Sequence, residues 1–208
     1  MTKIIFATGN ANKMREIKAI LADLNMEILS MKEAGVSAEA EENGATFIEN
    51  AIIKAKDIAA RVPDAIVMAD DSGLVVDALH GEPGIYSARY LGEDTSYSIK
   101  NANIISRLEG VPVEARTARF VCAIAAVLPD GRVLTTEGTI EGYIGYEERG
   151  NGGFGYDPIF MLPEYGCTTA ELSAEAKNAI SHRGKALQNM KLKLLNIWGT
   201  KDEGINLQ

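Results

Sequence analysis

The stretch Ala65-Ile66-Val67-Met68-Ala69-Asp70-Asp71-Ser72-Gly73 decides the fold. Its first five residues are small or apolar, which predicts a buried β-strand, and two adjacent carboxylates follow directly. Ligands of open α/β sheets bind beyond the carboxyl ends of the strands, so we expect Asp70 and Asp71 to lie at a functional site. Because neighbouring carboxylates repel each other, a cation should be close, either Mg²⁺ or a Lys or Arg side chain. The alternative is a polar turn after a core strand.

Composition excludes several classes of protein. The chain has 208 residues, of which 46% are hydrophobic, as expected for a globular protein with one well-formed core. A net charge of −8 argues against nucleic acid as a partner, and no apolar run approaches a membrane span. The first residues predict a strand rather than a signal peptide. Only two cysteines, Cys122 and Cys167, and two histidines, His80 and His182, are present, which favours a reducing cytoplasm and disfavours a zinc site.

The N-terminal residues predict a strand, a loop and a helix. Residues 3–7 are apolar, and the following helix has Ile17, Ile20, Leu21 and Leu24 at helical spacing. The loop between them, Thr8-Gly9-Asn10-Ala11-Asn12-Lys13, could direct backbone N–H groups at an anion. Lys13 opposes the helix dipole, which suggests a ligand charge nearby. Alternatively the loop only turns and caps the chain, with Lys13 in solvent.

An acidic loop and a second helix come before the Asp-Asp strand. Residues 27–30 predict another strand, and residues 39–44 form the acidic loop. Thr46-Phe47-Ile48-Glu49 has the pattern of a capping box, which would open a helix. Lys54 and Lys56 lie in the middle of that helix, so at least one of them should face outward.

The second half of the chain predicts antiparallel strands. Residues 74–76 suggest a further strand, and Asp94-Thr95 could cap a helix. Residues 118–128 and 132–143 predict a hairpin around Pro129-Asp130-Gly131. The sheet should therefore be mixed, and the hairpin could form a second lobe.

Two further segments could contact a ligand. Residues 150–158 form a Gly-rich loop with two aromatic residues and a carboxylate, which suits a flat base but also fits a tight turn with core aromatics. The last helix is preceded by Lys177 and by Ser181-His182-Arg183-Gly184-Lys185. Basic groups at the start of a helix oppose its dipole, so a bound anion would explain why they stand there.

Together these segments offer carboxylates, cations and Gly-rich loops, the equipment for a metal–polyphosphate ligand with an attached base. The carboxylates are Glu41, Glu42, Asp70 and Asp71, and the cations are Lys13, Lys54, Lys177 and Arg183.

The same segments resemble a known family, the inosine/xanthosine triphosphate pyrophosphatases. Six motifs match in order and span nearly the whole chain: Thr8-Gly9-Asn10 with Lys13; Glu42 ahead of Thr46-Phe47-Ile48-Glu49-Asn50-Ala51; Asp70-Asp71-Ser72-Gly73-Leu74; Gly84-Ile85-Tyr86-Ser87-Ala88-Arg89-Tyr90; Gly153-Phe154-Gly155-Tyr156-Asp157-Pro158; and Ser181-His182-Arg183-Gly184.

This resemblance implies an α/β fold with an elongated mixed sheet flanked by helices, and two lobes with the active-site cleft between them. It implies one domain over residues 1–208 and a homodimer. It also implies hydrolysis of non-standard purine nucleoside triphosphates (ITP, dITP and XTP) to the monophosphate and pyrophosphate, with Mg²⁺ as the cofactor.

The resemblance also assigns roles to residues. Asp71 would activate water and, with Glu42, hold the metal; Glu41 is the neighbouring candidate, but the distance from Lys54 favours Glu42. The phosphates would be held by Thr8, Gly9, Asn10, Ala11, Asn12, Lys13, Lys54 and Ser72. The nucleotide and its base would lie against Phe154, Gly155, Tyr156, Asp157, Lys177, His182 and Arg183.

Two other functions compete with this one. A phosphatase with an aspartyl-phosphate intermediate usually has two Asp residues separated by one residue, whereas Asp70 and Asp71 are adjacent. A non-enzymatic nucleotide sensor needs the cations but not the acidic metal site, so Glu42, Asp70 and Asp71 disfavour it.

Overall fold

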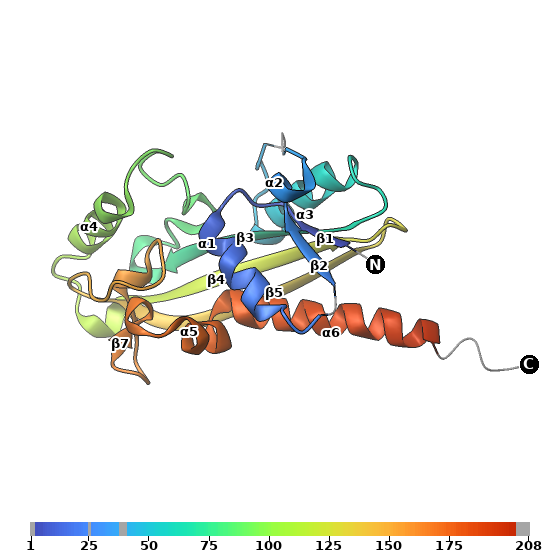
Figure 1. Ribbon diagram of the computed structural model, residues 1–208. Helices are drawn as coiled ribbons and strands as arrows, with labels where there is room; N and C mark the ends of the chain where they lie inside the picture. Colours follow the sequence, from blue (N-terminus) through green and yellow to red (C-terminus); the bar gives the residue numbers. More distant parts are fainter. Residues whose placement is uncertain (1–2, 25, 38–40, 203–208) are drawn as a thin grey trace, which may run out of the picture.

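One mixed sheet runs through the molecule (Figure 1). The computed structural model describes residues 3–24, 26–37 and 41–202. Within these residues, seven strands form a sheet in the order β2-β1-β3-β4-β5-β6-β7, and helices flank it along its length. The elongated α/β fold expected from the sequence is confirmed.

The strands divide the sheet into a short parallel part and a longer antiparallel part. β1 pairs in parallel with β2 and β3, and every later pairing is antiparallel. The strands are β1 (Lys3–Phe6), β2 (Glu27–Ser30), β3 (Ile66–Val76), β4 (Thr117–Val127), β5 (Val133–Ile144), β6 (Phe160–Leu162) and β7 (Cys167–Thr168).

Helices connect and cover these strands. The α-helices are α1 (Ala11–Ile20), α2 (Met31–Ala34), α3 (Phe47–Ala59), α4 (Tyr97–Arg107), α5 (Ala174–Ile180) and α6 (His182–Asp202). The short 3₁₀ helices are η1 (Asp77–Leu79), η2 (Gly84–Tyr86), η3 (Val113–Ala115), η4 (Asp157–Ile159) and η5 (Thr169–Glu171). None of the described helices is long and apolar enough to cross a lipid bilayer.

The Asp-Asp stretch corrects one prediction. β3 does not end at the aspartates but continues through them to Val76, so residues 74–76 are part of the same strand. The reason is β4, which pairs with β3 from Val67 to Val76 and keeps the backbone extended. By contrast, β1 pairs with β3 only as far as Met68, so the expected strand end is the end of the parallel pairing.

Two helix starts differ from the sequence prediction. Thr46 caps α3 by accepting from the backbone N–H of Glu49, but the Glu49 carboxylate accepts from Ala45 N–H at 2.7 Å, one residue earlier than in a capping box. α4 begins after Ser96, whose side chain caps it, and not after Asp94-Thr95. Of the acidic loop, Glu39 and Ala40 lie outside the described residues.

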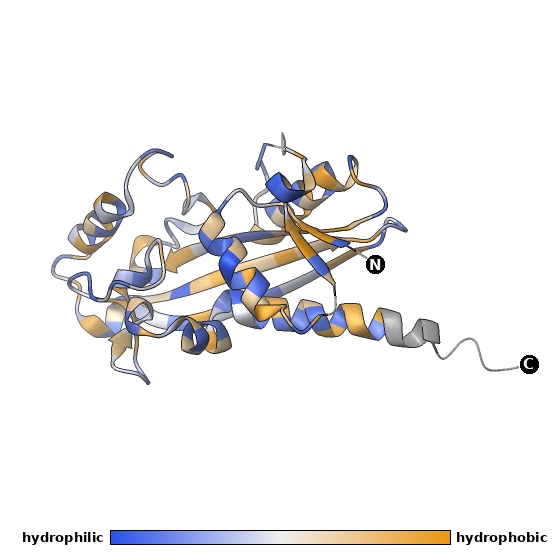
Figure 2. Cartoon of the chain, viewed as in Figure 1, coloured by the Kyte–Doolittle hydropathy of each residue, from blue (hydrophilic) through white to orange (hydrophobic). Residues whose placement is uncertain are grey.

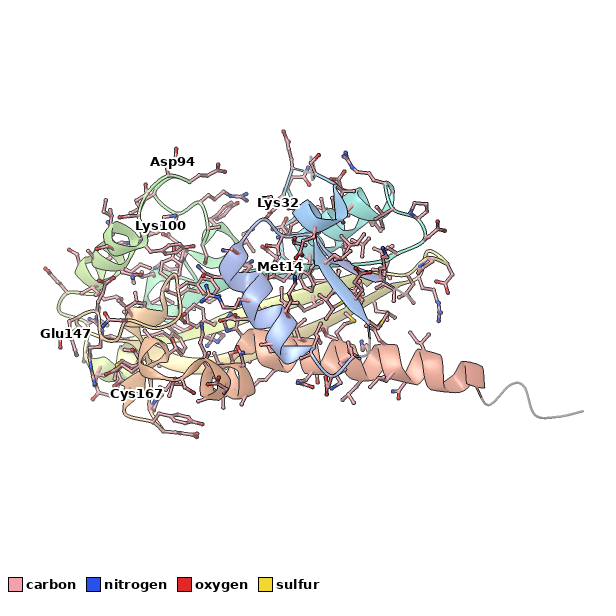
Figure 3. The ribbon with its side chains drawn as sticks, viewed as in Figure 1. Met14, Lys32, Asp94, Lys100, Glu147 and Cys167 are labelled. Atoms are coloured by element: carbon pink, nitrogen blue, oxygen red, sulfur yellow. The ribbon has the colours of Figure 1, made fainter. Side chains whose placement is uncertain are left out.

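The core forms three buried clusters that follow the pleat of the sheet. Successive residues of a strand point to opposite faces. Ile4 and Phe6 of β1 therefore join α1 and α6 in one cluster, which includes Met14 of α1 (Figure 3), while Ile5 packs with α3 in another. The third cluster lies at the far end of the sheet, around α4 and β6. Figure 2 shows hydrophobic residues along the central strands, which are buried on both faces. A division into lobes stays a prediction.

α6 packs unusually close to β5. A Cβ on Gly138 would lie 2.3 Å from the carbonyl oxygen of His182 and 2.7 Å from the amide nitrogen of Ala186. Beside it, the Thr136 hydroxyl donates to the carbonyl of Ala186 at 2.8 Å. The missing side chain thus lets the first turn of α6, which holds His182 and Arg183, lie against the sheet.

We predict that Gly138→Ala lowers the free energy of unfolding by about 1–3 kcal/mol, because backbone atoms must move to make room. Urea unfolding followed by circular dichroism would measure the change. Gly9→Ala is the matched control, since a Cβ there meets no atom within 4 Å and the stability should be nearly unchanged. Equal stability of the two variants would show that α6 is not held at this distance.

Candidate active site

A cavity of about 860 Å³ opens beside the middle of β3. This volume suits a nucleotide-sized ligand. Its walls come from the loop before α1, from α3, from the Gly-rich loop and from the start of α6, segments far apart in the sequence. The polar residues of its lining include Glu42, Lys54, Asp70, Asp71, Asp157, Lys177, His182 and Arg183.

The pleat of β3 separates the two aspartates. Because adjacent strand residues point to opposite faces, Asp70 and Asp71 have different partners although they are neighbours in the sequence. Asp70 contacts Lys13 of α1 and Arg183 of α6, whereas Asp71 contacts Lys54 of α3. β1 has ended at this point, so no strand covers the edge of β3 that carries them. The expected cations are present, one set on each face.

Asp70 is buried and lies at the centre of a charged network. Its Oδ2 atom lies 2.9 Å from Lys13 Nζ and 3.2 Å from Arg183 Nη2, and it accepts a 2.6 Å hydrogen bond from the Ser72 hydroxyl. Burial alone would raise the pKa of Asp70, but the charges of Lys13 and Arg183 outweigh burial and hold this pKa well below its ordinary value. The other oxygen, Oδ1, is buried with no hydrogen-bond partner among the described residues.

Asp71 shares one ammonium group with a second carboxylate. Lys54 Nζ lies 3.1 Å from Asp71 and 3.5 Å from Glu42, and Asn50 donates to Asp71 at 3.3 Å. Burial raises the pKa of Asp71, and the Glu42 charge adds to this, while Lys54 opposes it. The pKa of Lys54 is itself raised despite burial, because Asp71, Asp70 and Glu42 surround it. Lys54 therefore stays charged, and Asp71 is the more basic of the two aspartates.

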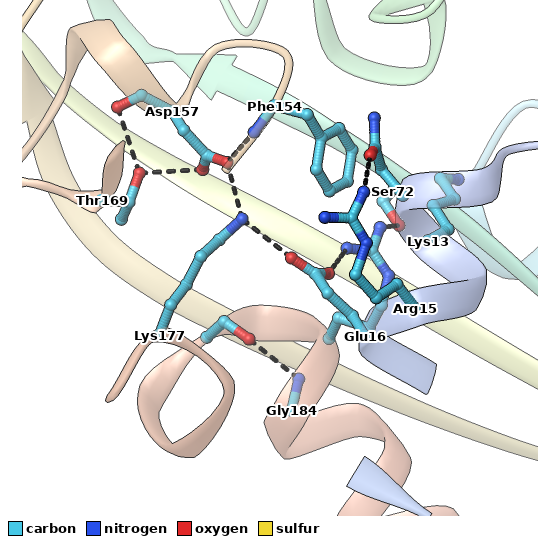
Figure 4. Close-up of polar contacts among 12 residues, drawn as sticks. Lys13, Arg15, Glu16, Ser72, Phe154, Asp157, Thr169, Lys177 and Gly184 are labelled. Atoms are coloured by element: carbon cyan, nitrogen blue, oxygen red, sulfur yellow. Dashed lines mark hydrogen bonds and ion pairs between the residues drawn. The ribbon is translucent and has the colours of Figure 1, made fainter. Parts of the chain in front are cut away.

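A chain of ion pairs lies at the end of the cavity that the Gly-rich loop and the start of α6 form (Figure 4). Lys177 Nζ lies 2.6 Å from Asp157 and 2.9 Å from Glu16, and Arg183 Nη1 lies 2.6 Å from the other oxygen of Glu16. The Phe154 ring covers both cations, with its centroid 4.8 Å from Lys177 Nζ and 5.7 Å from the guanidinium carbon of Arg183. This end therefore presents a flat aromatic surface with donors beneath it.

His182 contributes a neutral donor to the same end. Its ring stacks on Phe120 at 4.9 Å between centroids, and its Nδ1 atom has no partner among the described residues. Burial lowers the pKa of His182 well below its ordinary value, and the charges of Arg183 and Lys177 lower it further. At neutral pH the imidazole is therefore uncharged and carries one N–H donor.

Clear relatives of this chain are found among known proteins. A model of the Ham1 family matches residues 4–193. The chain belongs to the Ham1 family. It is 48% identical over 197 residues to the dITP/XTP pyrophosphatase of Exiguobacterium sibiricum, covering 95% of this chain and 99% of that protein. It is 52% identical over 191 residues to the dITP/XTP pyrophosphatase of Geobacter sulfurreducens, covering 92% and 96%.

Solved structures of the Ham1 family share the fold. The HAM1 protein of Coxiella burnetii superimposes with a TM-score of 0.85 at 39% identity, covering 94% of this chain and 100% of that one. The Ham1 protein of Staphylococcus aureus gives a TM-score of 0.83 at 40% identity, covering 94% and 99%. The family resemblance inferred from the six motifs is confirmed.

Most of the residues predicted for the site do line the cavity. They are Thr8, Gly9, Asn10, Lys13, Glu42, Lys54, Asp71, Ser72, Phe154, Gly155, Tyr156, Asp157, Lys177, His182 and Arg183. Ala11 and Asn12 do not: they begin α1, whose cap is the Asn10 side chain, which accepts from the backbone N–H groups of Asn12 and Lys13. Glu41 is exposed and outside the lining, whereas Glu42 lies in it.

Several residues at the site were not singled out from the sequence. Asn50, Ser87 and Arg89 stand inside quoted motifs, which is a usable signal. Glu16 has no such signal, because a lone glutamate on a helix is usually solvated; only the fold brings it to Lys177 and Arg183.

The basic residues of the site have partners within the protein. Lys13 and the basic residues near α6 are expected to indicate a ligand anion, which stays a prediction, and protein carboxylates pair with Lys13, Lys177 and Arg183. Lys185, outside the cavity, donates to the Thr139 carbonyl. Among the described residues that line the cavity, the number of carboxylates, five, equals the number of Lys and Arg side chains. An entering polyphosphate must therefore compete with carboxylates for these cations.

We predict that Asp70→Asn lowers the free energy of unfolding by about 3–5 kcal/mol, because it leaves the buried Arg183 and the half-buried Lys13 without their shared counter-charge. The exposed ion pair of Asp77 with Arg119 supplies the control, and Asp77→Asn should change stability by about 1 kcal/mol or less. Urea unfolding at pH 7 measures both. Similar losses in the two variants would show that the ion pairs of Asp70 contribute no more to stability than an exposed ion pair does.

Proposed function

We propose that the chain hydrolyses dITP, ITP and XTP to the monophosphate and pyrophosphate. The observation that carries this proposal is one cavity with two different ends. Carboxylates around Lys54 lie at one end, and the aromatic surface of Phe154 with Lys177, His182 and Arg183 lies at the other. The dITP/XTP pyrophosphatase relatives are about half identical to this chain over nearly its whole length, which supports the same substrates.

The phosphate end suits Mg²⁺. Among the described residues no three His, Cys, Asp or Glu side chains converge as a closed metal site. Mg²⁺ is usually held by only one or two carboxylates together with substrate phosphates and water, however, and the oxygens of Glu42 and Asp71 meet at Lys54. We assign these two carboxylates to the metal. The bound ion would supply positive charge to the phosphates and screen the carboxylates from them.

The phosphates would take the place of carboxylates as partners of the lysines. Lys54 lies beside Glu42 and Asp71, and Lys13 lies beside Asp70. Thr8, Gly9, Asn10 and Ser72 line the same cavity. Asp71 would accept a proton from the water that attacks the α-phosphorus. The bond from that phosphorus to the bridging oxygen breaks, and its electron pair leaves with pyrophosphate. The raised pKa of Asp71 suits a general base, since a more basic carboxylate accepts the proton more readily.

The base end would select an oxygen at position 6 of the purine. Arg183 and the neutral His182 are donors, and the Phe154 ring offers a stacking surface. Inosine and xanthosine carry an acceptor oxygen at position 6. Adenosine carries an amino group there, so a donor of the base would face the donors of the protein. Leaving such buried groups unpaired costs roughly 1–3 kcal/mol each.

The resemblance also supports a homodimer working in the cytoplasm. Both Cys122 and Cys167 are free thiols, which fits a reducing compartment. Sedimentation equilibrium would measure the oligomeric state directly.

We predict pyrophosphate, and not phosphate, as the product from dITP, and full loss of turnover in excess chelator. Asp71→Asn keeps the shape of the side chain but removes its charge and its basicity, so kcat should fall by about 10³-fold or more. The experiment follows pyrophosphate and phosphate release in parallel. Phosphate release would identify a phosphatase instead, and tight dITP binding without any turnover would identify a sensor.

We predict that kcat/KM for dITP or XTP exceeds that for ATP by about 10⁴-fold, as in sites built on hydrogen bonds to the substrate. GTP keeps the oxygen at position 6, so its exclusion should be weaker. Arg183→Lys keeps the charge beside Asp70 but loses the planar fork, and should reduce the dITP/ATP ratio at least tenfold. A nucleotide panel with both proteins measures these ratios. Comparable kcat/KM for ATP and dITP in the unchanged protein would refute the proposed selectivity.

A further inference from the structure

One wall of the cavity is a short irregular segment, Ser87-Ala88-Arg89, which belongs to no helix or strand. Ser87 anchors its start: the hydroxyl accepts from Leu74 N–H of β3 at 2.9 Å and donates to the Gly84 carbonyl at 2.6 Å. Arg89 lies at its other end. Its Nη2 atom donates to the Glu42 carbonyl at 3.3 Å, so the wall reaches the acidic loop.

Side chains from outside hold both carbonyl groups of this wall. The Tyr156 hydroxyl donates to the Ser87 carbonyl at 2.7 Å, and Lys100 Nζ donates to the Ala88 carbonyl at 2.6 Å. Because a peptide unit is planar, holding its oxygen fixes the orientation of the whole unit. The two bonds therefore fix the backbone on which the Arg89 side chain stands.

Lys100 is placed unusually for a lysine (Figure 3). It belongs to α4 and its residue is only 1% exposed. Glu93 is the carboxylate whose charge acts on it, and the two form no ion pair. Its ammonium group lies 5.0 Å from the centroid of the Tyr97 ring, and that ring packs edge-on against Tyr156. A buried ammonium group is unfavourable unless it is hydrogen bonded, so its burial ties the Lys100 ammonium to the Ala88 carbonyl.

α4 carries further contacts to the same segment. Asn103 and Arg107 follow Lys100 at helical spacing, on the same face, and both bond to the Tyr90 hydroxyl, at 2.7 and 2.8 Å. On its neighbouring face, Asn101 donates to the Gly155 carbonyl of the Gly-rich loop at 3.3 Å. α4 thus holds two walls of the cavity, and Lys100 is its buried link to the wall that carries Arg89.

We propose that Lys100 is a positioning residue, which through the Ala88 carbonyl fixes the Ser87-Ala88-Arg89 wall and places Arg89 against the bound nucleotide. The proposal rests on the proposed function for its substrate. Lys100 does not line the cavity and acts only through this wall.

Lys100→Met tests the proposal, because it keeps an unbranched side chain, only one atom shorter, and the helix preference, but removes the donor. The KM for dITP should rise about tenfold, while kcat changes less than about threefold, and Lys100→Arg should restore most of the loss. Lys193→Met is the matched control: Lys193 also donates to a carbonyl, that of Thr135 at 2.7 Å, but lies on α6 outside the cavity, and its KM should be unchanged.

A double-mutant cycle then asks whether Lys100 acts through Arg89. In an Arg89→Ala background, Lys100→Met should raise KM by less than about twofold, because the group it positions is gone. A full tenfold rise in that background would overturn the proposal, as would equal KM values for Lys100→Met and Lys193→Met.

Trypsin gives a readout that does not depend on turnover. Cleavage after Arg89, followed by mass spectrometry without nucleotide, should be about tenfold faster in Lys100→Met than in Lys193→Met. Equal rates would overturn the proposal even if dITP is a substrate, whereas absence of dITP turnover in the unchanged protein would refute only the proposed function. If Lys100→Met does not fold, Lys100→Leu, which also has no donor, carries the same comparisons.

Discussion

The buried carboxylate of Asp70 is the interaction on which the site depends. It joins three elements, because Lys13 comes from α1, Arg183 from α6 and Asp70 itself from β3. None of the three charges could be buried alone without a penalty of several kcal/mol. The pairing therefore holds the first helix and the last helix against the same point of the sheet, where β1 ends and β3 continues.

Ion pairing between elements continues along the cavity. Asp157, Lys177, Glu16 and Arg183 alternate in sign from the Gly-rich loop to Asp70, and Lys54 stands between Glu42 and Asp71 on the other face. Such a site is electrostatically balanced before any ligand arrives. A polyphosphate ligand would consequently exchange one set of ion pairs for another, which fits a site that accepts a metal together with its substrate. The pairing also explains how so many charged groups can be buried in one small region.

Much of the fold could be predicted because it depends on local patterns. The apolar runs predicted the strands, the spacing of Ile17, Ile20 and Leu21 predicted α1, and Pro129-Asp130-Gly131 predicted the hairpin of β4 and β5. The six ordered motifs named the family and most residues of the cavity, since each motif is a continuous stretch that backbone geometry or a ligand constrains. The largest error lay where a distant partner decides: β3 continues past Asp71 only because β4 pairs with it. The two helix starts differed by one or two residues, within a single turn of chain.

The sequence by itself determined the element types, the family and the presence of carboxylates, cations and Gly-rich loops in one chain. Only the tertiary structure decided which charge meets which. Asp70 and Asp71 are neighbours in the sequence but face opposite sides of the sheet, whereas Glu16 and Lys177 are far apart in the sequence but lie 2.9 Å apart. Lys100 shows the same limit, because nothing in its local sequence marks it as buried against Ala88. The periodicity of the sequence predicts which face of its own strand or helix a side chain lies on. The residue that it contacts depends on how the strands and helices pack against one another.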